Sequence, residues 1–409
     1  MKNPIRSLLT RKGSGAAGAV AEEPAATATP WRTRAIWLVP SLLILLIIAP
    51  LAFFCLFPWS CAGRAQRAQD RSLLIRADDL RETDVLPHSQ GAISPDRNYV
   101  YCATFQLAWD GLRQSLSNEP VGLEGDPDLA AVLNQSAFDH SSLSATSYLA
   151  MAGRADQGIV ESIRRAMADK FPNATLQVPD PPEHTAFYVY AYLAKEAAFR
   201  EAFDRLAEPL EFGSGPRAAK VAAFGKERFG VTDRDDLLCR QVTILDYRSS
   251  DDFILSLHPT SQHEQIILAK TQPKATLGDT MDAVRERIDN ASIAETMRRP
   301  MLGESLKIPL VAVGAERPYH ELTGKRLRNR GWEGYYLAEA RQGIRFRLDE
   351  WGARLESRSG LPVAAAVPDQ PRHFVFDKPF LLYMKETSAP VPYFAIWVAT
   401  PEILQEVKQ

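Results

Sequence analysis

The longest apolar stretch of the chain lies close to its beginning. No charged side chain occurs over the 29 positions from Ala35 to Gly63, which as a helix would be about 43 Å long against a hydrocarbon core of about 30 Å. Its three prolines argue against one perfect helix, but spanning helices tolerate proline. A cleaved signal peptide is the main alternative, although the run is long, starts late and has no small-residue cleavage site after it. We therefore expect a single transmembrane helix over residues 35–59 and a single-pass membrane protein.

Residues 1–34 and 60–97 flank this predicted span. The first segment is rich in Ala, Gly, Pro and Thr and has almost nothing to bury, so we expect a disordered basic tail. The second mixes charges with few apolar residues, which indicates a juxtamembrane linker with one short helix. Arginines follow the span as well as precede it. Exporting a tail with six positive charges opposes the membrane potential, however, whereas large domains translocate largely regardless of flanking charge. We expect the C-terminal domain to be extracytoplasmic.

A folded domain is predicted over residues 98–405. Apolar residues recur at helical spacing over Cys102–Leu116 and Asp156–Phe171. The later segments are β-branched or aromatic, and many alternate with polar residues. These strand candidates are Thr185–Ala194, Gln241–Tyr247, Asp252–His258, Gly343–Glu350, His373–Glu386 and Pro392–Pro401. Early helices followed by largely antiparallel strands indicate the α+β class, with mixed, mainly antiparallel sheets.

Composition and charge exclude several classes of protein. The 409 residues are 45% hydrophobic and 24% charged, which is typical of a globular protein. Lys and Arg number 48 against 50 Asp and Glu, so the net charge of 48 − 50 = −2 gives no attraction to nucleic acid phosphates. Four cysteines are too few and too scattered for a disulfide framework or a zinc cluster. Cys102 is interpreted as a buried structural thiol, while a single disulfide between Cys102 and Cys239 stays open.

Residue types that catalyse reactions or bind metals form no recognisable motif. The seven histidines include no HExxH pattern, and the pair His258 and His263 lacks a nearby cysteine or an acidic partner. No GxSxG sequence occurs. We therefore expect no catalytic residue, no metal site and no cofactor, and we do not expect an enzyme. The remaining alternative is an enzyme whose site forms only in the fold.

Near the C-terminus, an alternating strand, an acidic and glycine-containing hinge, a loop of small residues and two apolar strands follow one another. The strings GIRFRLDEWGARLESRSG and FVFDKPFLLYMKETSAPVPYFAIWVATP carry this order, with Phe376, Pro379 and Phe380 as a signature. They resemble the serpins, and in particular divergent serpin-like proteins of the bacterial type. Ser305–Leu322 continues the resemblance upstream, which fades before Thr185. The resemblance implies a serpin-like fold with N-terminal helices.

The resemblance also implies a reactive loop that a serpin inhibitor offers to a protease and, once cut, inserts into a sheet as an extra strand. The candidates are Gly352, Ala353, Arg354, Leu355, Glu356, Arg358, Ala364, Ala365, Ala366 and Val367. Between Gly352 and Phe374 there are 21 residues, about 70 Å when extended at about 3.3 Å each. The length therefore permits insertion.

Alternation along the hinge is compatible with an inserted strand, because one face is uncharged and the other charged. The uncharged face consists of Ala353, Leu355, Ser357 and Ser359, and the charged face contains Arg354, Glu356 and Arg358. Inhibitory serpins resemble one another in using small residues here, so the longer side chains are expected to slow insertion. The stretch Ala364–Val367 would suit a protease with a small apolar pocket. A flexible linker between strands is the alternative interpretation.

Two functions remain. The first is a membrane-anchored, serpin-like binding or scaffold module that has lost protease trapping. The second is a membrane-tethered suicide inhibitor of a serine or cysteine protease. Both imply lipid contact through residues 35–59 and a protein partner, either a protease or a membrane complex, and neither involves nucleic acid.

Overall fold

The computed structural model describes residues 75–135, 138, 142–174, 178–180, 184–261, 263–351 and 370–407. All of these residues belong to one compact unit that begins at Arg67. The predicted basic tail, the predicted transmembrane helix over 35–59 and all ten reactive-loop candidates lie outside the described residues. Within the described ranges, no helix is both long enough and apolar enough to cross a membrane.

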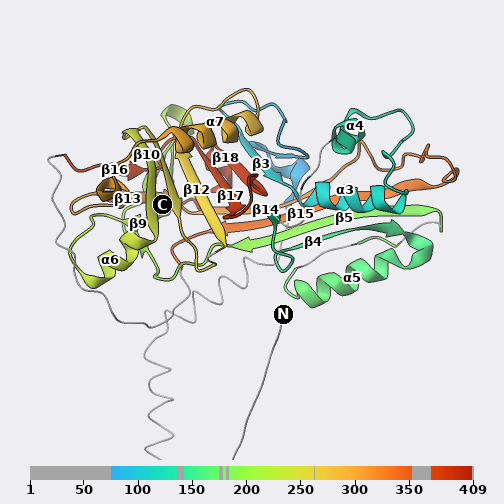
Figure 1. Ribbon diagram of the computed structural model, residues 1–409, viewed down its shortest axis with the longest axis horizontal. Helices are drawn as coiled ribbons and strands as arrows, with labels where there is room; N and C mark the ends of the chain where they lie inside the picture. The colour runs from blue at the N-terminus through green and yellow to red at the C-terminus, as the bar shows by residue number, and fades with distance from the viewer. Residues whose placement is uncertain are drawn as a thin grey trace, which may run out of the picture. The chain divides into compact units, whose positions relative to one another are not determined.

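Two large sheets form the centre of the unit (Figure 1). Sheet I has the order β1-β14-β15-β5-β4, from Ile75–Arg76, Val311–Pro318, Tyr336–Leu348, Ala186–Glu196 and Tyr148–Arg154. Sheet II has the order β10-β11-β12-β17-β18-β3-β2, from Val242–Ser249, Asp252–Leu257, Glu264–Lys270, Phe380–Glu386, Phe394–Val398, Asn98–Cys102 and Thr83–Leu86.

Two smaller sheets and five α-helices complete the described part of the chain. Sheet III has the order β16-β13-β9-β6, from His373–Val375, Ser305–Pro309, Ala223–Lys226 and Asp204–Arg205, while β7 (Leu210–Phe212) pairs with β8 (Ala219–Val221). The helices are α3 (Thr104–Ser115), α4 (Asp128–Gln135), α5 (Ile159–Lys170), α6 (Asp233–Arg240) and α7 (Leu277–Asn290). Short 3-10 turns lie at Ala77–Asp79, Ala155–Gln157, Gly215–Arg217, Glu295–Met297 and Pro401–Ile403. The mixed architecture confirms the predicted α+β class.

Strand β5 is buried on both faces, which explains its continuous run of large apolar residues. Phe187 and Val189 face one cluster that includes α3, whereas Tyr188, Tyr190 and Tyr192 face another that includes α5. In Figure 1, α3 and α5 lie on opposite sides of β4 and β5. Sheet I is therefore the middle layer of three at this end of the unit.

The other end of the unit is built on sheet II, whose strands pair in antiparallel order from β10 to β3. Helix α7 lies along one side of this sheet (Figure 1), and its residues Leu277, Met281 and Val284 join the main core. The helix begins after Thr276, whose Oγ1 accepts a hydrogen bond from the Asp279 amide at 3.0 Å.

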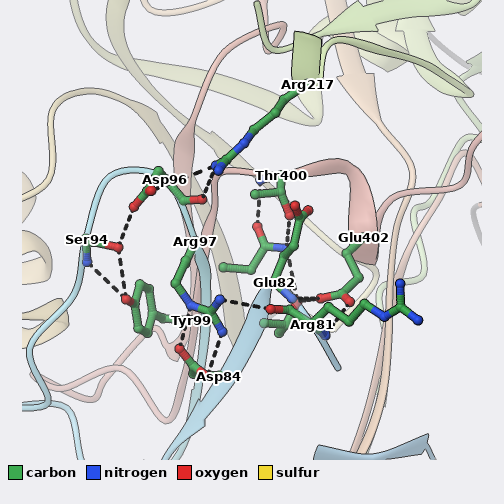
Figure 2. Close-up of polar contacts among 12 residues, drawn as sticks. Arg81, Glu82, Asp84, Ser94, Asp96, Arg97, Tyr99, Arg217, Thr400 and Glu402 are labelled. Carbon is green, nitrogen blue, oxygen red and sulfur yellow. Dashed lines mark hydrogen bonds and ion pairs between the residues drawn. The ribbon is translucent and has the colours of Figure 1, made fainter. Parts of the chain in front are cut away.

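Residues 75–97 form part of the folded unit, although their charge pattern predicts a linker. Strand β1 pairs in parallel with β14, and β2 pairs in parallel with β3, which buries Val85 and Leu86. Figure 2 shows how this segment is held by the C-terminal end of the chain: the Glu402 carboxylate accepts hydrogen bonds from the amides of Arg81 and Glu82 at 2.7 and 2.9 Å. The folded domain thus includes residues from Ile75 onward rather than from Asn98.

The predicted strand His373–Glu386 is two strands in two sheets. β16 belongs to sheet III and β17 to sheet II, and residues Phe376–Pro379 cross between them. Asp377 supports the crossing, because its carboxylate accepts a hydrogen bond from the buried Lys270 ammonium at 2.6 Å. A proline at 379 and a paired aspartate at 377 explain why the apolar run cannot continue as one strand.

Candidate functional site

The candidate site is the seam between β5 and β15, together with the two ends of the predicted reactive loop. The ten loop candidates fall within residues 352–369, outside the described part of the chain. Its two ends, at Trp351 and Gln370, are described.

Strands β5 and β15 run in parallel and are hydrogen-bonded directly, with the register from Tyr336↔Ala186 to Arg347↔Glu196. Their outer neighbours pair in antiparallel fashion, β14 with β15 and β4 with β5. A segment that followed β15 and turned back would run antiparallel to both strands of the seam. It could replace one parallel pairing by two antiparallel ones, which are slightly more stable per residue.

Hydrogen bonds also join the segments that follow β5 and β15, past the last residue pair of the seam. The amides of Ala197, Phe199 and Phe203 donate hydrogen bonds to the carbonyls of residues 347, 351 and 350 at 3.2, 3.3 and 2.9 Å. The Glu350 carboxylate also pairs with Arg205 at 3.1 Å. We call these contacts the latch. Because of the latch, the chain that leads into the loop is fixed up to its last described residue.

Glutamine 342 holds the middle of β15 from the inner face of the sheet. Its Nε2 donates to the Cys102 carbonyl and to Thr104 Oγ1 at 3.0 Å each, and its Oε1 accepts from the Tyr319 hydroxyl at 2.8 Å. All four residues are fully buried. A satisfied polar network at this depth fixes the register of β15 over α3.

The outer face of the seam is covered by α5 on the β5 side and by charged side chains on the β15 side. Tyr188 and Tyr190 are each only 1% exposed, and burial raises the pKa of Tyr188 to about 12. On β15, Arg341 pairs with Glu339 at 3.0 Å and with Glu316. Burial by itself lowers the pKa of Arg341, but these two carboxylates raise it overall. The seam is therefore enclosed rather than open.

A buried ion pair anchors the end of the loop that leads into β16. Arg372 Nε lies 2.6 Å from Glu304 Oε1, with side chains 8% and 0% exposed. The Arg372 guanidinium also donates to the carbonyls of Met297 and Arg299 at 3.0 and 3.3 Å. Next along the chain, Ser305 Oγ and His373 Nδ1 are 2.9 Å apart. We call this group the exit anchor.

The two described cysteines are separate and carry protonated thiols at neutral pH. Both are free, so the disulfide that the sequence left open between Cys102 and Cys239 does not form. Burial raises the pKa of Cys102 to about 11 and that of Cys239 to about 12. Of His258 and His263, the first bonds Thr243 Oγ1 through Nε2 at 2.8 Å. The described residues contain no group of three or more His, Cys, Asp or Glu side chains that could hold a metal ion.

No protein-family model and no curated protein matches the chain. Solved structures similar to it are serpins. Mouse protein-Z dependent protease inhibitor gives a TM-score of 0.48 at 14% identity, covering 74% of this chain and 91% of the other. Serpin48 of Tenebrio molitor gives 0.43 at 13% identity over 74% and 92%, and uncleaved ovalbumin 0.42 at 10% over 75% and 94%. At these identities the likeness concerns the fold alone.

Sequence reasoning did not find the residues that hold the seam and the two ends of the predicted loop. Glu304 and Arg372 stand singly among apolar or mixed neighbours, so neither spacing nor periodicity distinguishes them. The one local signal is Gln342, a polar residue at a position of β15 whose even-numbered neighbours are apolar and buried. A buried polar residue in such a place indicates a satisfied network.

Proposed function

We propose that the chain is a membrane-anchored, serpin-like binding or scaffold module that does not trap proteases. The observation that carries this proposal is the closed seam between β5 and β15, in which β5 is buried on both faces. An inserted strand would have to separate the paired residues of the whole seam and also break the latch.

The hinge sequence adds to this barrier. An inserted strand would alternate Arg354, Glu356 and Arg358 on one face with uncharged residues on the other. Whichever face took the charged residues, it would lie next to a buried face of β5, either under α5 or over α3. Burying charged side chains without partners is costly. The cut segment would therefore not insert, and the chain would behave as a substrate of the protease.

The sequence supports the membrane part of the proposal through residues 35–59. An apolar run of this length in contact with lipid would leave the basic tail in the cytoplasm and the folded domain outside it. A tether suits a binding module, since a module is not consumed by one encounter whereas a suicide inhibitor is. The protein partner would be a protease or a membrane complex, and binding would leave that partner covalently unchanged.

Thermal unfolding of the full chain before and after cleavage within residues 361–368 tests the proposal. A module with a closed seam changes its melting temperature by only a few degrees when cut. A rise of about 10 °C or more would correspond to several kcal/mol of released strain and would overturn the proposal. The matched control is the same protease site placed in the turn between β7 and β8, where both strands stay paired with each other after cleavage.

The alternative function is a membrane-tethered suicide inhibitor of a serine or cysteine protease. The parallel geometry of the seam favours it, because an antiparallel strand fits between β5 and β15. In that case, alanine at positions 354, 355, 356 and 358 speeds trapping, and a complex with an elastase-type protease survives SDS. Alanines at exposed Glu208, Glu211 and Arg228 are the control. If the hinge variant forms no such complex, the inhibitor function is excluded for that class of protease.

A further inference from the structure

A cavity of about 590 Å³ lies between α7 and the side of sheet II that this helix covers. Strands β10, β11, β12 and β17, helix α7 and the turn before β18 all contribute to its wall. This volume falls within the range of small-molecule sites, about 300–1,000 Å³. The cavity shares no lining residue with the seam, the latch or the exit anchor.

One end of the cavity is apolar. Ile267 and Tyr383 are direct cross-strand partners on β12 and β17, and they are 2% and 3% exposed. Met281 and Ile288 line the cavity from α7, seven residues apart and thus on one face of the helix. The ring of Tyr383 and these aliphatic side chains form two walls that suit a flat or extended apolar body.

The next cross-strand pair on the same face of the sheet makes the cavity polar. Gln265 and Lys385 are partners two residues along β12 and β17 from Ile267 and Tyr383. Lys385 is partly buried, and burial lowers its pKa although Asp289 opposes the shift. Arg285 and Asp289 lie at the rim on α7. Arg285 pairs with Asp282 at 2.8 Å, whereas the Lys385 ammonium donates a hydrogen bond to the Ala389 carbonyl at 3.1 Å, so Lys385 is the cationic group at this end that an acidic ligand can reach.

Ser256 supplies a hydrogen-bonding group that the protein does not use. It is 2% exposed, lines the cavity, and its Oγ has no hydrogen-bond partner among the described residues. Its cross-strand partner on β10, Thr243, is already hydrogen-bonded to His258. Buried hydroxyl groups in native proteins nearly always have a partner, so the site calls for a polar atom supplied from outside the chain.

We propose that this cavity binds a small amphipathic anion, with its apolar body between Ile267 and Met281 and its acidic group beside Lys385. The Ser256 hydroxyl donates a hydrogen bond to a polar atom of the ligand. A carboxylate or sulfonate on an aromatic or acyl body has this chemistry, and the mixed lining orients it in one direction.

The test compares two probes that differ in one group. 8-Anilino-1-naphthalenesulfonate carries a sulfonate, and N-phenyl-1-naphthylamine is the same ring system without it. In a fluorescence titration of the full chain, we expect one molecule of the sulfonate probe to bind per chain, with an affinity about tenfold higher than that of the neutral probe. Lys385→Met abolishes this difference by weakening the sulfonate probe alone. Met281→Trp fills the apolar end of the cavity and lowers the affinity for both probes. The binding that remains in this variant measures how much probe binds elsewhere on the chain.

The matched control is Lys274→Met, which removes the same charge from an exposed position before α7 that does not line the cavity; both affinities stay unchanged. If Lys385→Met unfolds the chain, Arg285→Gln on the exposed rim repeats the charge test. Equal affinity for the two probes, or an unchanged affinity in Met281→Trp, overturns the proposal. Neither outcome depends on whether the loop inserts, so the proposed function is tested separately.

Discussion

Removing the arginine of the exit anchor, by Arg372→Met, is expected to destabilise the fold strongly. The guanidinium makes two hydrogen bonds to the Glu304 carboxylate, at 2.6 and 3.1 Å, and two to backbone carbonyls. Methionine retains most of the aliphatic volume but none of these donors. The Glu304 side chain, which is 0% exposed, would remain as a buried carboxylate without its cation.

Breaking a buried ion pair in this way costs about 3–5 kcal/mol. We expect the lower end of that range, because Glu304 still accepts a hydrogen bond from the Met301 amide at 2.8 Å. The double variant Glu304→Leu with Arg372→Met removes both charges and is expected to recover most of the loss, since apolar replacements of buried pairs are often neutral. Arg328→Met is the control, because its exposed pair with Asp126 contributes less than about 1 kcal/mol.

The assay is equilibrium unfolding in urea, followed by tryptophan fluorescence, with hydrogen exchange read at the amides of β13 and β16. Exchange at β16 is expected to accelerate most, because Arg372 directly precedes that strand. An Arg372→Met chain within about 1 kcal/mol of the parent, with a double variant that is no more stable, would refute the reasoning. In that case the strand pairing of β13 and β16 would hold the loop end without the ion pair.

Three further changes have effects that follow directly from the contacts. Asp251→Asn is expected to cost about 1 kcal/mol or less, because the carboxylate is half exposed. Hydrogen bonds from two lysines lower the pKa of Asp251 to about 2, so the loss, measured by urea unfolding, is present above pH 4 and vanishes as pH falls to 2; a constant loss would contradict this. Gly225→Ala should prevent normal pairing of β9 with β13, since its Cβ would lie 2.0 Å from the Leu306 carbonyl oxygen at φ +141°, and a native melting temperature would refute it. Glu402→Ala leaves two amides without acceptors and is expected to cost about 1–2 kcal/mol, with faster hydrogen exchange in β2; unchanged exchange there would count against the anchoring role.

The sequence predicts much of the fold because its elements have clear local patterns. Helical spacing locates α3 and α5 to within a few residues, and the aromatic run of β5 and the strands β10, β11 and β18 lie where apolar and β-branched residues predict them. Of β15, only the C-terminal part from Gly343 is predicted, because the strand begins at Tyr336. The linker prediction over residues 60–97 misses β1 and β2. These strands are short and rich in charge, and they are held by pairing with β14 and β3, far along the chain.

The contacts that define the candidate site could not be predicted in the same way. Glu304 and Arg372 are separated by 68 positions, and Gln342 bonds residues about 240 positions before it. Each is a single polar residue whose role depends on which strands become neighbours. The resemblance to serpins predicts which segment leads into a loop, but the latch and the closed seam emerge only when β5 and β15 are brought together.

Chain length links the exit anchor to the seam. The 18 residues from 352 to 369 can extend about 60 Å at about 3.3 Å each. If both ends stay fixed, a segment entering the seam must also return, so it can reach about 30 Å, whereas the 13 residues of β15 extend about 43 Å. An uncut loop therefore cannot line the whole seam while Arg372 holds its end. Cleavage within residues 352–369 and substitution of Arg372 each remove this restraint, and they do so independently. If the seam stays closed after both changes, it must be held by the latch, by Gln342 and by α5, which covers β5.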